Sequence, residues 1–96
     1  MNVNQIPDLF QSKTRLAIVS ALITGEKTFA EVKDITEMSD GNLSSHITKL
    51  ADEGYVTVKK DFFKNRPRTR YSITEKGLKS FTEYVELLEK ILNNSQ

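Results

Sequence analysis

The spacing of apolar residues changes at Gly54, and this change constrains the fold more than any other feature of the sequence. Before Gly54, apolar residues recur every three or four positions, which is the period of a helix with one buried face. After it, Val56 and Val58 alternate with polar residues, which is the period of a strand. Tyr71 and Ile73 repeat the alternation and supply a return strand. The sequence therefore predicts helices followed by an antiparallel β-hairpin.

The first helix should begin at Ser12 and end before Gly25. Serine is favoured at helix N-caps, and glycine can take the left-handed conformation that commonly ends a helix. Residues 1–11, which include Pro7, show no clear period, and we expect an arm or a short turn there. The apolar residues at helical spacing in the first helix are Leu16, Val19, Leu22 and Ile23.

Two further helices, joined by a short turn, should follow. Thr28 and Glu31 have the spacing of a capping box, in which the hydroxyl and the carboxylate each satisfy a backbone N–H at a helix start. The second helix should therefore cover 29–36, and the third should cover 40–53 and be closed by Gly54. The residues expected to face the core are Phe29, Val32 and Ile35 in the second helix and Leu43, Ile47, Leu50 and Ala51 in the third.

A long helix over 75–93 should end the chain. Thr74 is placed to cap it, and Glu75 puts a negative charge in its first turn, where the helix dipole favours one. The predicted fold class is thus mainly α with a small β-hairpin: three helices, a hairpin and a long final helix in a single domain, 1–96. The apolar residues of the final helix step by three, four, three and four through Leu78, Phe81, Val85, Leu88 and Leu92, and Tyr84, Leu87 and Ile91 widen the stripe.

Positive charge is concentrated in the expected hairpin loop, 61–70. From Lys59 to Arg70 there are six Lys or Arg residues and a single acid, Asp61, although the formal net charge of the chain is only +1. Clustering of this kind suits the neutralisation of phosphates, which depends on local charge. Pro67 cannot donate to a ladder and should lie in the loop or at a sheet edge rather than in a paired strand. The candidate phosphate contacts of the loop are Lys64, Arg66, Arg68 and Arg70.

A second interpretation of the loop stays open, because hairpin tips are often charged simply through being solvated. Phe62 and Phe63 are expected to anchor the base of the loop rather than to stack on bases.

Helix 40–53 turns a small, polar face away from its apolar residues. Asn, Ser, Thr and Lys on such a face can hydrogen-bond base edges or phosphates in a major groove, and a merely solvated face is the alternative. His46 lies between the two faces and is expected to be half-buried. A metal role for it is disfavoured, since the chain has no second imidazole and no thiol. The candidate DNA contacts of this helix are Asn42, Ser44, Ser45, Thr48 and Lys49.

The composition argues against several classes of site. Without cysteine there is no disulfide, thiolate metal site or thiol switch. We expect no metal, no cofactor and no enzymatic activity, since no nucleophile–base pair or glycine-rich phosphate loop is present. No apolar run approaches the roughly 20 residues needed to cross a bilayer, and the first residues lack a secretory signal, so a cytoplasmic location is expected.

Four segments together resemble the short winged-helix regulators of the MarR/ArsR-like group and their single-domain relatives: Ser39 to His46, Glu53 to Val56, Arg66 to Thr69 and Ile73 to Gly77. The resemblance covers about 12–92. It implies a homodimeric transcriptional regulator that binds double-stranded DNA with helix 40–53 in the major groove and the wing, 61–70, on the backbone or minor groove. The metal-binding cysteines of some members and the ligand-pocket helices of others are absent, so neither branch supplies a ligand for this chain, and the effector stays unknown.

The apolar stripe of helix 75–93 is wider than one contact requires. The helix could dock on its own core, but the extra width indicates a second contact, and the resemblance implies that the first and last helices contribute to dimerisation. The candidate dimer contacts are Leu78, Phe81, Val85, Leu88 and Leu92. The main alternative function is a winged helix that serves as a protein-interaction module, with the basic loop on an acidic partner.

Overall fold

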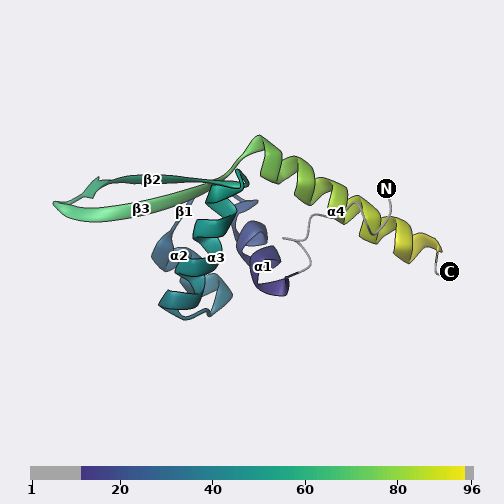
Figure 1. The fold of residues 1–96 in the computed structure, drawn as a ribbon, viewed down its shortest axis with the longest axis horizontal. Helices are drawn as coiled ribbons and strands as arrows, with labels where there is room; N and C mark the ends of the chain where they lie inside the picture. Colours follow the sequence, from purple (N-terminus) through teal and green to yellow (C-terminus); the bar gives the residue numbers. More distant parts are fainter. Residues whose placement is uncertain (1–11, 95–96) are drawn as a thin grey trace.

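Three short helices support a long β-hairpin that projects to one side, and a fourth helix leaves on the opposite side (Figure 1). The computed structural model describes residues 12–94, so the arm or turn expected over 1–11 lies outside the described residues. The predicted fold class, a winged helix with three helices, a hairpin and a long final helix, is confirmed. In chain order the elements are α1 (Lys13–Leu22), β1 (Lys27–Thr28), α2 (Phe29–Thr36), α3 (Asp40–Asp52), β2 (Val56–Phe63), β3 (Arg66–Ile73) and α4 (Glu75–Asn94).

The predicted helix starts are set by side-chain caps. The Ser12 hydroxyl accepts the N–H of Arg15 at the start of α1. At α2 the capping box is complete: the Thr28 N–H donates to Glu31 Oε1 (2.9 Å), and the Glu31 N–H donates to Thr28 Oγ1 (3.2 Å). Hydrogen bonding to Thr28, first to its backbone N–H and then to its side chain, lowers the pKa of the Glu31 carboxyl.

Gly54 closes α3 and turns the chain into β2. Its φ is +83°, its N–H donates to the Ala51 carbonyl (3.0 Å), and the Tyr55 N–H donates to the Leu50 carbonyl (2.9 Å). This pair of bonds is the Schellman pattern. The helix ends at Asp52, one residue before the predicted end, because Glu53 is its C-cap.

The core lies where α1, α2 and α3 meet the base of the hairpin. Ile35 was expected there, but it is 54% exposed. At about 100° per residue, Phe29 lies on one side of Val32 and Ile35 on the other. The core is on the side of Phe29, which packs against it. The buried core residues are Ile18, Val19, Leu22, Val32, Leu43, Ile47, Leu50, Tyr55, Val56 and Tyr71.

The hairpin is longer, and its loop shorter, than the sequence predicted. The loop expected over 61–70 is a turn of only Lys64 and Asn65, whose φ values are +51° and +64°. Two central residues with positive φ make the mirror-image turn whose twist matches that of paired strands, so pairing extends to the turn. Phe63 and Arg66, the residues on either side of the turn, are the last pair of the hairpin.

Pro67 lies within a paired strand, opposite Phe62. In a hairpin with a two-residue turn this pair is not hydrogen-bonded, so the proline nitrogen faces the other edge of β3. β1 pairs with β3 only at Arg70 and Tyr71, so it does not reach Pro67. The prediction that Pro67 lies outside a paired strand is therefore wrong, and the strand tolerates the proline because its nitrogen faces a stretch of β3 that β1 does not cover. The short strand β1, which completes a sheet of order β1-β3-β2, was not predicted because two residues show no period.

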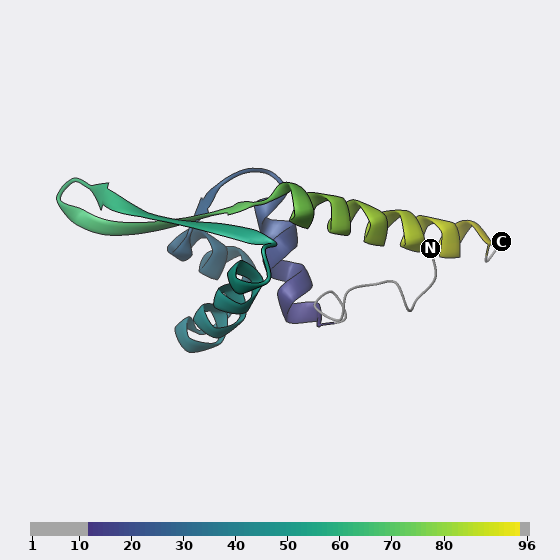
Figure 2. The same ribbon diagram turned by 45° about the horizontal axis from the view of Figure 1, so that its top comes forward.

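Gly77 sets how α4 leaves the sheet. Thr74 caps the helix as predicted, since its hydroxyl accepts the Gly77 N–H (3.0 Å). A Cβ on Gly77 would lie 2.4 Å from the Tyr55 carbonyl oxygen and 2.8 Å from Ile73 Cγ1, so only glycine allows this approach. From here α4 runs away from the hairpin, as both Figure 1 and Figure 2 show, and the molecule measures 55 × 24 × 21 Å.

Candidate nucleic-acid interface

The outer face of α3 carries small, polar side chains. Ser39 caps the helix by accepting the Asn42 N–H (3.3 Å), and Lys33 of α2 pairs with Asp40 in the first turn (2.8 Å). The core face holds the helix through three buried residues, Leu43, Ile47 and Leu50. All the candidate contacts predicted on this helix are exposed: Asn42, Ser44, Ser45, Thr48 and Lys49.

His46 is half-buried, as predicted. Its Nδ1 accepts a hydrogen bond from Nε of Arg15 in α1 (3.0 Å). The imidazole thus links α3 to α1.

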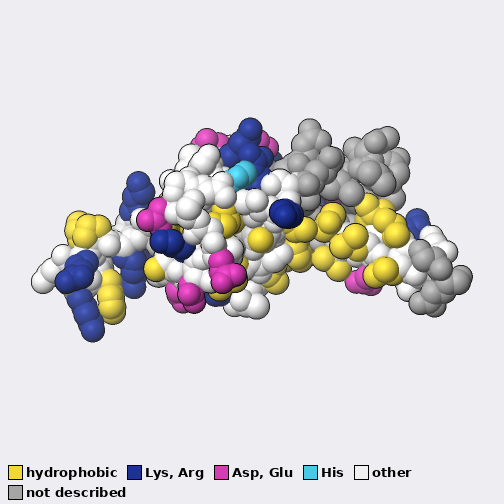
Figure 3. Space-filling view, turned by 90° about the horizontal axis from the view of Figure 1, so that it is seen from below, with side chains coloured by type: hydrophobic (Ala, Val, Ile, Leu, Met, Phe, Trp, Pro, Cys, Tyr) yellow, Lys and Arg dark blue, Asp and Glu magenta, His cyan; other side chains and the backbone are white. Residues whose placement is uncertain are grey.

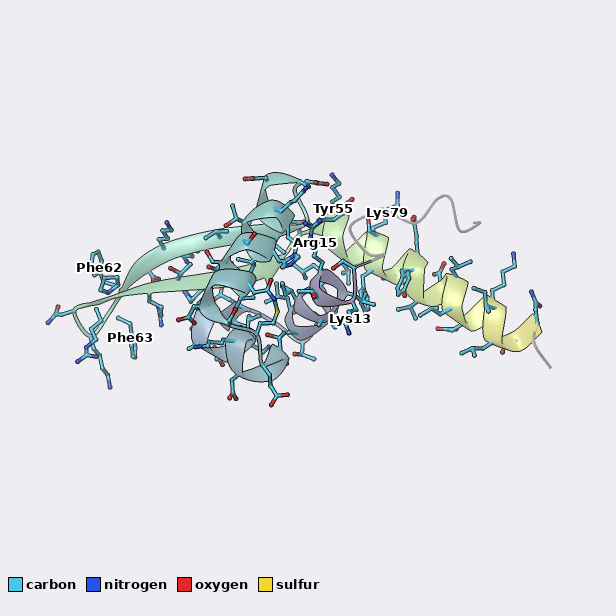
Figure 4. All side chains as sticks on the ribbon, turned by 60° about the horizontal axis from the view of Figure 1, so that its bottom comes forward. Lys13, Arg15, Tyr55, Phe62, Phe63 and Lys79 are labelled. Carbon is cyan, nitrogen blue, oxygen red and sulfur yellow. The ribbon has the colours of Figure 1, made fainter. Side chains whose placement is uncertain are left out.

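The hairpin has two faces, because residues opposite each other in an antiparallel pair point the same way and successive pairs alternate. We call the face toward α3 the inner face; it consists of Val58, Lys60, Phe62, Pro67, Thr69 and Tyr71. The outer face consists of Lys59, Asp61, Phe63, Arg66, Arg68 and Arg70. Phe62 and Phe63 lie on opposite sides of the hairpin in Figure 4.

The inner face and α3 enclose a groove of about 360 Å³. Ser44 and Thr48 line it from the helix, and Lys60 and Thr69 line it from the hairpin. Lys60 was not among the predicted contacts. The available signal was its spacing of two residues from Val58, which places both side chains on the face of the hairpin that packs toward the helices.

Two wing arginines are held by acids on the outer face. Arg68 donates to both carboxylate oxygens of Asp61 (3.1 and 3.2 Å), and Arg70 donates to Asp61 Oδ2 (2.5 Å) and to Glu26 Oε1 (2.7 Å). The hydrogen bond from Arg68 lowers the pKa of the Asp61 carboxyl, although burial opposes the shift. The carboxylate therefore persists until the pH falls below its ordinary titration range. Arg68 and Arg70, both predicted as phosphate contacts, are thus already paired with carboxylates of this chain.

The tip of the hairpin carries Lys64 and Arg66, both exposed. The Phe63 ring is covered by Lys64 Nζ, 5.4 Å from its centroid, and by Arg68 Cζ at 4.8 Å. Phe62 is 74% exposed. The expectation that both phenylalanines anchor the base of a loop is wrong, because the two-residue turn places them at the end of the hairpin, where Phe63 is 53% exposed as well. In Figure 3 the basic side chains gather over the hairpin.

A family model described as a winged helix DNA-binding domain matches residues 14–92. The chain belongs to this family. In this winged helix, β2 and β3 form the wing, and α3 is the helix that precedes it.

Known proteins with the same fold include transcriptional regulators. An uncharacterized protein from Methanocaldococcus jannaschii is 36% identical over 83 residues, which cover 84% of this chain and 90% of that protein. A transcriptional regulator homologue from Pyrococcus horikoshii superposes with a TM-score of 0.84 and 26% identity over 93% of this chain and 89% of that one. A MarR-family regulator from Enterococcus faecalis superposes with a TM-score of 0.85 and 19% identity, over 98% of this chain and 86% of that one. The fold is that of DNA-binding regulators, and a protein-interaction module is not favoured.

The apolar stripe of α4 in this winged helix is largely open to solvent. Leu78, Leu88 and Leu92 are 48%, 41% and 65% exposed, whereas Phe81 and Val85 are half-buried. Figure 3 shows apolar side chains along this helix, at the opposite end of the molecule from the wing. Among residues 12–94 no helix is both long and apolar enough to span a membrane.

Proposed function

We propose that this winged helix is a sequence-specific transcriptional regulator that binds double-stranded DNA as a homodimer. α3 enters a major groove, and the wing lies over the adjacent backbone and minor groove. The observation that carries the proposal is the groove in which the polar side chains of α3 face Lys60 and Thr69 of the wing. A phosphate backbone between the two elements meets hydroxyl donors on one side and a cation on the other.

The wing residues have different roles in this proposal. Lys64 and Arg66 at the tip are exposed, and we assign them to phosphates, together with Lys60 on the inner face. Arg68 and Arg70 are already paired with Asp61, so they stabilise the wing and reach DNA only at the expense of that pairing.

The homodimer would form through the apolar stripe of α4, with a contribution from α1. Twofold symmetry would place the two copies of α3 about 34 to 36 Å apart, one turn of DNA, and would favour an inverted repeat. Selection from random duplexes tests the whole proposal. Recovery of one enriched inverted repeat is the expected result, and recovery of no enriched sequence would contradict it.

Replacing Lys64 and Arg66 together with alanine should weaken binding to all duplexes. Each lost phosphate contact should reduce the salt dependence of log K by up to about one unit of slope. A titration across salt concentrations measures both effects. Arg68→Ala is the matched control: we expect a smaller change of slope, because its charge is already partnered by Asp61. Unchanged slope in the double variant would remove the wing tip from the interface.

Replacing Ser45 or Lys49 with alanine should alter sequence preference. A good bidentate contact to a base edge discriminates by about 1 to 3 kcal/mol, so selection with either variant should tolerate more bases at one position of each half-site. Equal loss of affinity for selected and random duplexes would show instead that α3 only contacts the backbone.

A further inference from the structure

Phe62 is the most exposed large apolar side chain among residues 12–94, at 74%. Its neighbour Phe63 is 53% exposed, and the cations of Lys64 and Arg68 lie against its ring. Within the same part of the chain, no cation or aromatic ring is placed against Phe62. An aromatic ring left this open gains most from a partner that removes it from water.

The backbone holds Phe62 firmly in this position. Strand pairing continues past it to Phe63 and Arg66, and the turn beyond is closed by two residues with positive φ. Pro67, directly opposite, adds a second apolar group with a fixed φ to the same face. The ring is thus presented at the end of a paired ribbon.

The surroundings of Phe62 specify a polyanion as the partner. It lies on the inner face, next in line after Lys60, and close in sequence to Lys64 and Arg66 at the tip. Val58 lines the groove beside α3, and Phe62 lies four residues further along β2, a distance of about 13 Å along the strand. If α3 occupies a major groove, the neighbouring minor groove lies about half a turn, roughly 17 Å, along the duplex. The wing can therefore bring the ring to that groove while its lysines meet the flanking phosphates.

We propose that Phe62, backed by Pro67, is an apolar wedge that enters the minor groove and partly unstacks one base step. The inference rests on the proposed DNA binding and adds a bend in the duplex to it. Wedges of this kind kink DNA toward the major groove, and flexible pyrimidine–purine steps yield to them most easily. Phe62 would thereby favour such a step beneath each wing.

A tryptophan at position 62 reports on the wedge directly, because the chain contains no tryptophan. The probe is the duplex that the wild-type protein selects from a random library. When Phe62→Trp binds it, stacking against bases should strongly quench the indole emission. Phe63→Trp, on the outer face, is the matched control and should change little. Unchanged emission from Phe62→Trp, while anisotropy reports complex formation, would overturn the wedge.

Phe62→Ala provides a second measurement. We expect affinity for the selected duplex to fall about tenfold, with an unchanged salt slope because no phosphate contact is lost. The bend, measured by energy transfer between the duplex ends, should decrease, and Phe62→Leu should retain part of it. Wild-type affinity and bend in Phe62→Ala would overturn the wedge and leave DNA binding standing. Failure of the wild-type protein to select any duplex would remove the proposed function itself.

Discussion

Leu88→Glu should convert the proposed dimer to monomers and reduce affinity for an inverted repeat by about 100-fold or more. Leu88 is 41% exposed and lies in the middle of the α4 stripe. In a twofold interface the substitution occurs twice, so two carboxylates would have to be buried without partners. Sedimentation at micromolar concentration measures the first effect, and titration of the selected duplex measures the second. The second follows from the first, since two linked recognition helices bind far more tightly than one.

Asn93→Glu is the matched control for Leu88→Glu. It adds the same charge to α4, but at 100° per residue position 93 lies well away from Leu88, and its side chain is exposed. This variant should remain a dimer. Both variants should remain folded, and Asn93→Glu should unfold at the higher temperature because dimerisation stabilises its folded state. A wild-type protein that sediments as a monomer would overturn the dimer and assign the α4 stripe to another contact.

Local sequence signals predicted the helices of this fold well. The start of α2 was predictable because the side chain of each of Thr28 and Glu31 accepts the backbone N–H of the other, and the two residues are only three positions apart. The end of α3 was predictable because Gly54 adopts a positive φ, which residues with a side chain rarely adopt. The hairpin loop was not, because its basic residues and Pro67 are typical of a loop, and Lys64 with Asn65 lacks the glycine that usually signals a two-residue turn.

In the candidate site, too, features set by local sequence were predictable and features set by distant pairings were not. The polar face of α3 follows from helical periodicity alone, so its exposed residues could be named in advance. The pairing of Arg70 with Glu26 joins residues 44 positions apart, and no local pattern specifies it. Likewise, the pairing of Asp61 with Arg68 depends on strand register, which the unexpected turn determines. Charge counting therefore located the wing but did not distinguish free cations from paired ones.

Gly77→Ala should destabilise the protein by about 1 to 3 kcal/mol, the usual cost of forcing an extra group into a packed site. The new methyl group would lie 2.4 Å from the Tyr55 carbonyl oxygen, a backbone atom that cannot rotate away, so α4 or the start of β2 must move. Better helix propensity returns only about 1 kcal/mol. Chemical denaturation at fixed protein concentration measures the loss.

Gly41→Ala separates this steric effect from helix propensity. Gly41 is exposed in α3, and a Cβ there would meet nothing within 4 Å, so the same substitution should stabilise the protein by roughly 0.5 to 1 kcal/mol. Opposite signs for the two variants are the expected result. Because Gly77 sets the departure of α4, its variant should also move the two copies of α3 apart or together in a dimer, and affinity for an inverted repeat should fall further than stability alone explains. Equal stability and equal operator affinity in Gly77→Ala would mean that α4 shifts freely against Tyr55, and that the spacing of the recognition helices is set elsewhere.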